Sequence, residues 1–250
     1  MNILGNGTLS DDAGDDVCTV AYLCRDYILG APLSYHILMA TTGIFWTVAY
    51  LCYIVQSQRH GTYRGIPPAA LFLNVTWEFF FAFIHTEQQS PPQLVMNYIW
   101  VSFDFIILGQ FLWWKVRPTF LTGPIVERYW VCLLMMTTVG FLLAFVHELH
   151  DYDGLYMAYL QNLLMSILFC RDAWNDMEYV ASDAWSSWIP GILRWIGTAF
   201  TLVAMAIRTE AKSPLLMFVS GAIFCWDVAY VSTTYHAWRQ NKMDMSKFCK

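Results

Sequence analysis

Seven long apolar stretches constrain the fold of this chain more than any other feature of its sequence. A helix needs about 20 mostly apolar residues to cross a bilayer, and each stretch approaches that length. The stretches run over residues 36–56, 67–86, 94–114, 128–148, 154–170, 188–207 and 215–238. A helix satisfies its own backbone hydrogen bonds in lipid. The pattern therefore predicts an all-α polytopic membrane protein, a seven-transmembrane helix bundle.

The composition excludes several other classes of protein. Hydrophobic residues make up 57% of the 250 residues and charged residues only 13%, whereas about a quarter of a soluble domain is charged. This rules out a disordered chain, a coiled coil and an ordinary soluble enzyme. The net charge of −5 leaves no basic surface for nucleic acid. The seven cysteines contain no CxxC pair, so neither a zinc site nor a disulfide framework is indicated.

One transmembrane domain between two tails is the expected organisation. Residues 1–35 form an acidic tail without the long apolar core of a cleavable signal peptide. Residues 36–238 hold the seven spans, and residues 239–250 form a short basic tail. Cytoplasmic loops are enriched in Lys and Arg. With the N-terminus outside, ten of the 14 Lys and Arg residues fall on the inner side and three on the outer side.

The fourteenth basic residue, Arg194, lies inside the sixth predicted span. An arginine in such a position pairs with an acid or extends its charged end to the membrane interface. Because Arg194 stands near the inner end of its span, we expect it to reach the interface.

Three carboxyl groups are predicted at the same depth in the membrane. Glu78, Asp104 and Asp227 stand 10 or 11 residues from the inner ends of their spans. At about 1.5 Å per helical residue, this places each of them about 15–17 Å deep, near the middle of a hydrocarbon core about 30 Å thick. Charged residues within spans are costly and usually face a cavity or a partner.

Amides and aromatic residues accompany these acids. Asn74 shares a helix face with Glu78 at i, i+4, and Asn97 and Asn162 are further candidates for supporting polar groups. The aromatic candidates within a turn of the acids are Trp77, Phe81, Trp100, Phe224, Trp226 and Tyr230. Burial disfavours the ionised form of a carboxyl group, so one acid can stay protonated and act as a general acid. A water-poor aromatic pocket around it suits carbocation chemistry.

Other functions use the same kinds of residue. Intramembrane carboxyls also serve as structural hydrogen-bond partners, in proton relays and in transport pathways. A proton-coupled transporter is therefore an alternative, although the sequence shows neither the repeated halves nor the interrupted helices of such proteins.

Three motifs match known chemistry poorly. Asp11-Asp12-Ala13-Gly14-Asp15 is formally the DDxxD metal–diphosphate motif, but it lies in the polar tail before any span. The run from Asn175 to Asp183 resembles the motif of intramembrane aromatic prenyltransferases, with Tyr179 in place of an aspartate. An intramembrane prenyltransferase remains a second alternative. His147 and His150 are spaced wrongly for two zinc ligands on one helix face. No metal site is predicted.

Two short motifs carry a resemblance to a known family. The run Asn74-Val75-Thr76-Trp77-Glu78 in the second span and the pair Trp226-Asp227 in the last resemble the integral-membrane terpene cyclases of fungal meroterpenoid and indole-diterpene biosynthesis. The chain length, the predicted seven spans and the separation of the two acids fit the same family.

The resemblance implies an activity and a catalytic pair. Members of this family cyclise a prenyl chain, often one ending in an epoxide, attached to an aromatic, polyketide-derived or indole headgroup. They use neither a metal nor a cofactor, and their acidic pair corresponds to Glu78 and Asp227. The expected partners are a lipophilic prenylated substrate and membrane lipid. The headgroup, the number of rings and the oligomeric state are not readable from the sequence.

The charge asymmetry predicts the topology. The N-terminus should be lumenal and the C-terminus cytosolic in the endoplasmic reticulum, so a reporter fused after Lys250 should give a cytosolic signal. A lumenal signal at this position would contradict the predicted number of spans.

Overall fold

The structure is a computed structural model that describes residues 33–86, 91–117, 154–175, 188–207 and 213–248, with residues 137, 139, 140 and 143 between them. All regular secondary structure in these ranges is helical, so the predicted all-α class is confirmed. The elements are α2 (Leu33–His60), α3 (Pro68–Phe79), η1 (Phe80–Ile84), α4 (Pro91–Phe111), η2 (Leu112–Val116), α7 (Leu155–Asn175), α9 (Trp188–Ile207) and α10 (Pro214–Phe248).

Proline and π-helical turns define the ends of several helices. α3 and α10 begin at Pro68 and Pro214, where a missing backbone N–H is tolerated because the first turn has no intrahelical partner for it. η1 and η2 are π-helical continuations of α3 and α4. Such segments often occur at functional sites, and η1 begins two residues after Glu78.

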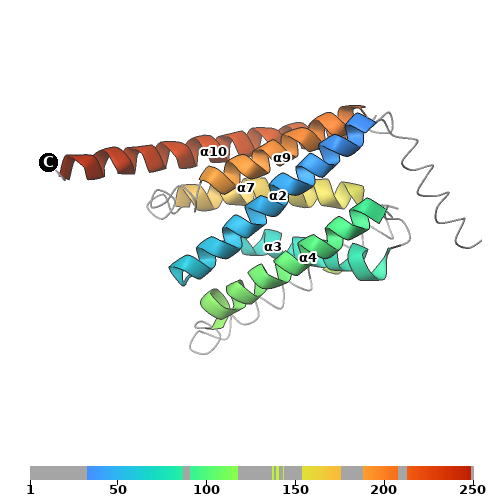
Figure 1. The fold of residues 1–250 in the computed structure, drawn as a ribbon, viewed down its shortest axis with the longest axis horizontal. Coiled ribbons are helices and arrows are strands. Elements are labelled where there is room, and N and C mark those ends of the chain that lie inside the picture. The colour runs from blue at the N-terminus through green and yellow to red at the C-terminus, as the bar shows by residue number, and fades with distance from the viewer. Residues whose placement is uncertain are drawn as a thin grey trace, which may run out of the picture.

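Six helices form a closed ring in the described part of the chain. Each packs against two others, in the order α2, α4, α3, α7, α10 and α9, and α9 returns to α2. In Figure 1 they make an elongated bundle, with α10 extending beyond the others at its C-terminal end. The predicted tail of residues 239–250 is therefore helical as far as Phe248.

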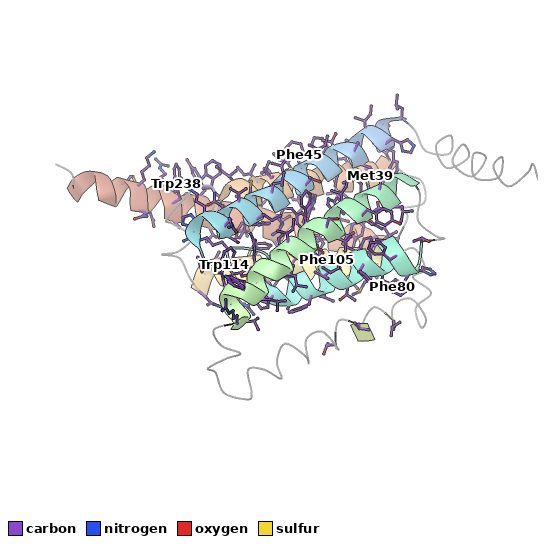
Figure 2. All side chains as sticks on the ribbon, turned by 60° about the horizontal axis from the view of Figure 1, so that its bottom comes forward. Met39, Phe45, Phe80, Phe105, Trp114 and Trp238 are labelled. Carbon is purple, nitrogen blue, oxygen red and sulfur yellow. The ribbon has the colours of Figure 1, made fainter. Side chains whose placement is uncertain are left out.

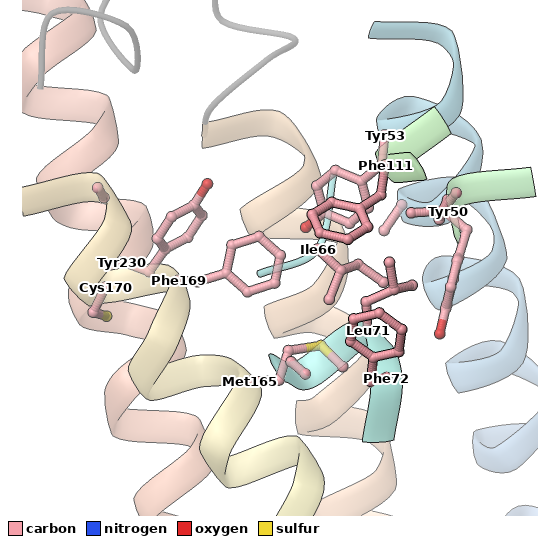
Figure 3. Packing of buried hydrophobic residues seen from close by; sticks show 14 residues of the cluster. Tyr50, Tyr53, Ile66, Leu71, Phe72, Phe111, Met165, Phe169, Cys170 and Tyr230 are labelled. Atoms are coloured by element: carbon pink, nitrogen blue, oxygen red, sulfur yellow. The ribbon is translucent and has the colours of Figure 1, made fainter. Parts of the chain in front are cut away.

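An aromatic core fills the middle of this ring (Figure 3). Tyr50 and Tyr53 reach it from α2, Phe111 from α4, Phe169 from α7 and Tyr230 from α10. The rings of Tyr53 and Phe169 stack with centroids 5.6 Å apart, and Phe169 meets Tyr230 edge-on at 5.4 Å. Such aromatic pairs add to the free energy gained from burial alone.

The outer surface is apolar, whereas many buried side chains are polar. Large apolar side chains such as Ile44 and Val55 on α2 are exposed, as is Phe105 on α4, which Figure 2 labels. Buried polar residues include Gln56, Ser166 and Thr198. Apolar groups outside and polar groups inside are expected when lipid surrounds the bundle.

The membrane class is supported, but the count of seven spans is not confirmed. Three helices are long and apolar enough to cross a bilayer: Leu33–His60, Gln93–Val116 and Pro214–Met243. Pro68–Ile84 and Trp188–Ala204 are shorter apolar helices. α7 is not among these three helices. Its 21 residues include the polar Gln161 and Ser166 and the charged Arg171 and Asp172, which lower its mean hydropathy. The predicted fourth span, 128–148, lies largely outside the described residues.

Small residues allow close approach between helices. On α9, Gly197 lies against α2, where its carbonyl accepts a hydrogen bond of 3.1 Å from the Thr42 hydroxyl. A Cβ atom at Gly197 would come within 2.6 Å of the Trp46 ring. Glycine at a helix–helix contact is a common device of membrane proteins.

Gly154 should tolerate no side chain. It precedes α7 with a φ of 71°, and a Cβ atom would lie 2.3 Å from the Phe81 ring and 2.7 Å from Trp77 Nε1. We expect Gly154→Ala to lower the free energy of unfolding by about 1–3 kcal/mol from backbone strain alone. Thermal unfolding in detergent should be compared with that of Gly109→Ala, whose added Cβ meets nothing within 4 Å. Equal stability of the two variants would contradict this packing.

Candidate active site

Two of the three predicted acids, Glu78 and Asp104, lie together on adjacent helices. Glu78 on α3 is 3% exposed and Asp104 on α4 is fully buried, and the two carboxyls are close enough to interact electrostatically. Among the described residues, no hydrogen-bond partner reaches Glu78 Oε2, and the polar groups beside Asp104 are uncharged. No described Lys, Arg or His forms a salt bridge with either acid. The acid pair, Glu78 and Asp104, thus has no compensating charge in the described part of the chain.

A polar network from α2, α3 and α7 lies beside the acid pair. Asn74, one turn before Glu78, donates a hydrogen bond to the Tyr50 hydroxyl, and its Oδ1 accepts one of 3.2 Å from Gln161 Nε2. Tyr50 and Asn74 are also the polar neighbours of Asp104. A supporting role of Asn74 in catalysis stays a prediction. Tyr50 and Gln161 are further members of the polar network to which Asn74 belongs.

The third acid, Asp227, forms a buried ion pair with Arg194. Arg194 Nη2 lies 2.6 Å from Asp227 Oδ1, and both residues are 1% exposed. Ser166 Oγ donates to Asp227 Oδ1 at 2.7 Å and accepts from Arg194 Nη2 at 2.9 Å. Thr198 Oγ1 donates to the other carboxylate oxygen at 3.2 Å. Three helices, α7, α9 and α10, meet at this ion pair.

The prediction that Arg194 reaches the membrane interface is wrong. Its guanidinium points into the bundle, 4.2 Å from the centroid of the Phe169 ring and 5.4 Å from that of Trp46. An arginine extends to the interface because an unpaired charge in the membrane is costly. Here Asp227 and the two aromatic faces supply the compensation inside the protein.

The acid pair and the ion pair are connected through α2. Tyr50 interacts with Glu78 and Asp104, whereas Tyr53, one turn further along, interacts with Arg194 and Asp227. The structure therefore divides the three predicted acids into two neighbouring groups. The sequence did not predict a role for Tyr50, Tyr53, Ser166 or Thr198. The i, i+3 spacing of the two tyrosines on an apolar helix was the available signal for the first two.

The predicted aromatic residues fall into three different environments. Tyr230 belongs to the core cluster, and Trp100 and Trp226 pack partly against it. Trp77 and Phe81 form a separate cluster with Leu73 and Met157, and Trp77 Nε1 donates a hydrogen bond of 3.0 Å to the Gly154 carbonyl.

Phe224 lies elsewhere on α10 and packs against Trp195, with ring centroids 5.7 Å apart. Of the six aromatic candidates, Trp100, Trp226 and Tyr230 are therefore the ones that the structure associates with the central core.

The two remaining amide candidates make no described hydrogen bond to the three acids. Asn97 is fully buried and accepts a hydrogen bond of 2.7 Å from Gln93 Nε2, one turn away on the same helix. Asn162 is half-buried, and its Oδ1 has no partner among the described residues.

The described residues contain no group of three His, Cys, Asp or Glu side chains that could hold a metal ion. The acidic tail motif, residues 11–15, lies outside the described part of the chain, as do residues 147–150 and 176–183.

Comparisons with known proteins identify the family of the chain. The family model of the Pyr4-like transmembrane terpene cyclases matches residues 31–240. The chain is also similar to the Pyr4-family terpene cyclase mfmH of Annulohypoxylon moriforme, with 29% identity over 169 residues. That alignment covers 65% of this chain and 66% of the relative, just under two thirds of its length. No solved structure matches the chain. A match to this family does not favour the prenyltransferase or transporter alternatives.

Proposed function

The chain belongs to the Pyr4-like transmembrane terpene cyclases of secondary metabolism, and we propose that it closes rings in the prenyl chain of a lipophilic aromatic, polyketide-derived or indole compound. The substrate reaches the enzyme from the membrane, which we take to be that of the endoplasmic reticulum. A carboxyl group, and no metal ion, starts the reaction by protonating the terminal epoxide or alkene of the chain.

The observation that supports this proposal most is the buried acid pair, Glu78 and Asp104. Burying an ionised carboxyl group without a partner costs far more than burying its protonated form. Two such groups within electrostatic reach of each other, without a salt bridge to any described residue, favour holding at least one proton between them. A protonated carboxyl group at this position is a general acid.

The proposed reaction moves one proton and a series of electron pairs. The O–H bond of the donor, Glu78, breaks as its proton passes to the epoxide oxygen. The C–O bond at the more substituted carbon then breaks, which leaves a hydroxyl group and a tertiary cation. The π electrons of the next double bond form a C–C bond to that cation, and the positive charge moves along the chain. Finally a base removes a proton, or a headgroup oxygen captures the cation.

The surroundings of the acids suit this chemistry. Aromatic faces attract cations, and Tyr53 and Tyr230 belong to the core beside Arg194 and Asp227. Water would capture a carbocation, so a site made of aromatic side chains protects the intermediate from it. Asp227, the second acid of the proposed catalytic pair, contributes a negative charge near this core.

Replacement of the two proposed catalytic acids tests this mechanism. Glu78→Gln and Asp227→Asn keep side-chain size but remove the acidic proton or the charge. Because general acid catalysis contributes about 10²–10⁴ in rate, Glu78→Gln should nearly abolish cyclisation, and Asp227→Asn should lower it strongly. Turnover should be measured in microsomes given an epoxyprenylated aromatic compound and normalised to inserted protein.

The control for both variants is the combined replacement of Asp11, Asp12, Asp15 and Asp16 by Ala. These residues lie in the polar tail, before the first apolar stretch, so their loss should change turnover little. An inactive tail variant together with near-normal Glu78→Gln and Asp227→Asn enzymes would contradict the proposed mechanism.

Removal of metal ions is a further test of the mechanism. Since protonation starts the proposed reaction, cyclisation should continue in the presence of EDTA at its rate in untreated microsomes. Loss of activity on chelation, with recovery on adding Mg²⁺, would instead support diphosphate chemistry and the prenyltransferase alternative.

A further inference from the structure

The described interior holds three acids but only one arginine, so two of the acids have no arginine with which to pair. Arg194, Asp227, Glu78 and Asp104 are all at most 3% exposed. The guanidinium group of arginine stays protonated in proteins, so Arg194 compensates one negative charge and no more. A second buried carboxylate would be an uncompensated charge at membrane depth, which is strongly unfavourable.

The hydrogen bonds show which acid receives that compensation. Asp227 Oδ1 accepts from Arg194 Nη2 at 2.6 Å and from Ser166 Oγ at 2.7 Å, while Oδ2 accepts from Thr198 Oγ1 at 3.2 Å. Both oxygens of Asp227 therefore act as acceptors, as the ionised form requires. In contrast, the groups beside Asp104 are the neutral hydroxyl of Tyr50 and the neutral amide of Asn74, and no described cation forms a salt bridge with it.

Groups on every helix around Asp227 agree with this assignment. Arg194 on α9 is the one described cation that bridges to it. Among the described residues, Tyr53 on α2 and Cys170 on α7 also interact with Asp227, and Tyr230 on α10 interacts with Arg194. The thiol and the phenols are neutral at physiological pH in their ordinary state, so they supply no competing charge.

We propose that Arg194 is a positioning residue that fixes Asp227 as a carboxylate and thereby leaves proton donation to the acid pair, Glu78 and Asp104. Asp227 then stays ionised beside the aromatic core, and the carboxylate left on the acid pair after donation receives the proton released from carbon at the end of the cascade. The C–H electron pair becomes the new double bond, and the proton adds to a carboxylate oxygen. This inference rests on the proposed cyclase function for its chemistry, and on the ion pair alone for its charges.

The test compares Arg194→Met, Arg194→Lys and the double variant Arg194→Met/Asp227→Asn. Removing one partner of a buried ion pair leaves a buried charge unless the other partner takes up a proton. Arg194→Met should therefore gain the infrared absorption of a protonated carboxyl group at neutral pH. The double variant, which removes both charges, should lack this gain and should insert at a level near that of the wild-type protein.

Activity provides the second readout. Preorganised charges at a developing charge are typically worth about 10²–10³ in rate, so Arg194→Met should lose about that factor. Arg194→Lys keeps the charge but not the planar fork of donors, and it should recover a measurable part of the loss. Adding Asp227→Asn to Arg194→Met should reduce turnover no further, because the two residues act as one unit.

Arg171→Met is the matched control. Arg171 pairs with Asp172 at 2.7 Å, but both side chains are exposed, at 58% and 43%. Its replacement should change neither the infrared absorption nor the turnover, since exposed ion pairs contribute little.

The outcomes separate this inference from the function on which it rests. Wild-type turnover of Arg194→Met, with no new protonated carboxyl group, would overturn the role given to Arg194. A new carboxyl signal in Arg194→Met and not in the double variant supports the ion-pair assignment even in preparations that cyclise no prenylated substrate. Absence of cyclisation in the wild-type protein itself would count against the proposed function only.

Discussion

The buried ion pair between Arg194 and Asp227 is the interaction on which the rest of the structure depends. It joins α7, α9 and α10 through Ser166 and Thr198, and its guanidinium contacts the aromatic core at Phe169. A charge in a membrane interior needs a partner, so the position of one arginine decides which acid carries a negative charge. The same arrangement leaves Glu78 and Asp104, on α3 and α4, without a described cation. The same ion pair therefore joins three helices and determines which acids lack a cation.

The ring of helices explains how such an arrangement is stable in lipid. Exposed apolar side chains cover the outside, whereas the polar side chains of several helices meet inside. Asn74 connects Tyr50 and Gln161, so the network beside the acid pair ties α2, α3 and α7 together. Interhelical hydrogen bonds and small residues such as Gly197 hold membrane helices together where lipid removes the usual hydrophobic drive. The proposed ring-closing cascade requires a site that holds a flexible prenyl chain in one folded form.

The sequence predicted the burial of the three acids but not their grouping. Depth along each helix follows from residue count, and Glu78, Asp104 and Asp227 are all buried in the bundle, while their common depth in the membrane stays a prediction. Which acids become neighbours depends on the order of helices around the ring, and hydropathy contains no information about that order. The error at Arg194 has the same cause, since its partner lies 33 residues away on another helix. Trp77 was predicted near the acids because it stands beside Glu78 in the sequence. Adjacent residues of a helix point about 100° apart, however, and Trp77 Nε1 donates its hydrogen bond to the Gly154 carbonyl.

The central claim is that the proton needed for cyclisation resides on the acid pair and not on Asp227. Infrared absorption of protonated carboxyl groups in the substrate-free enzyme at neutral pH tests it most directly, by comparing the wild-type protein with Glu78→Gln, Asp104→Asn and Asp227→Asn. The account predicts a protonated carboxyl signal that is lost or shifted in Glu78→Gln and in Asp104→Asn and unchanged in Asp227→Asn. A signal that disappears in Asp227→Asn and persists unaltered in the other two variants would contradict it.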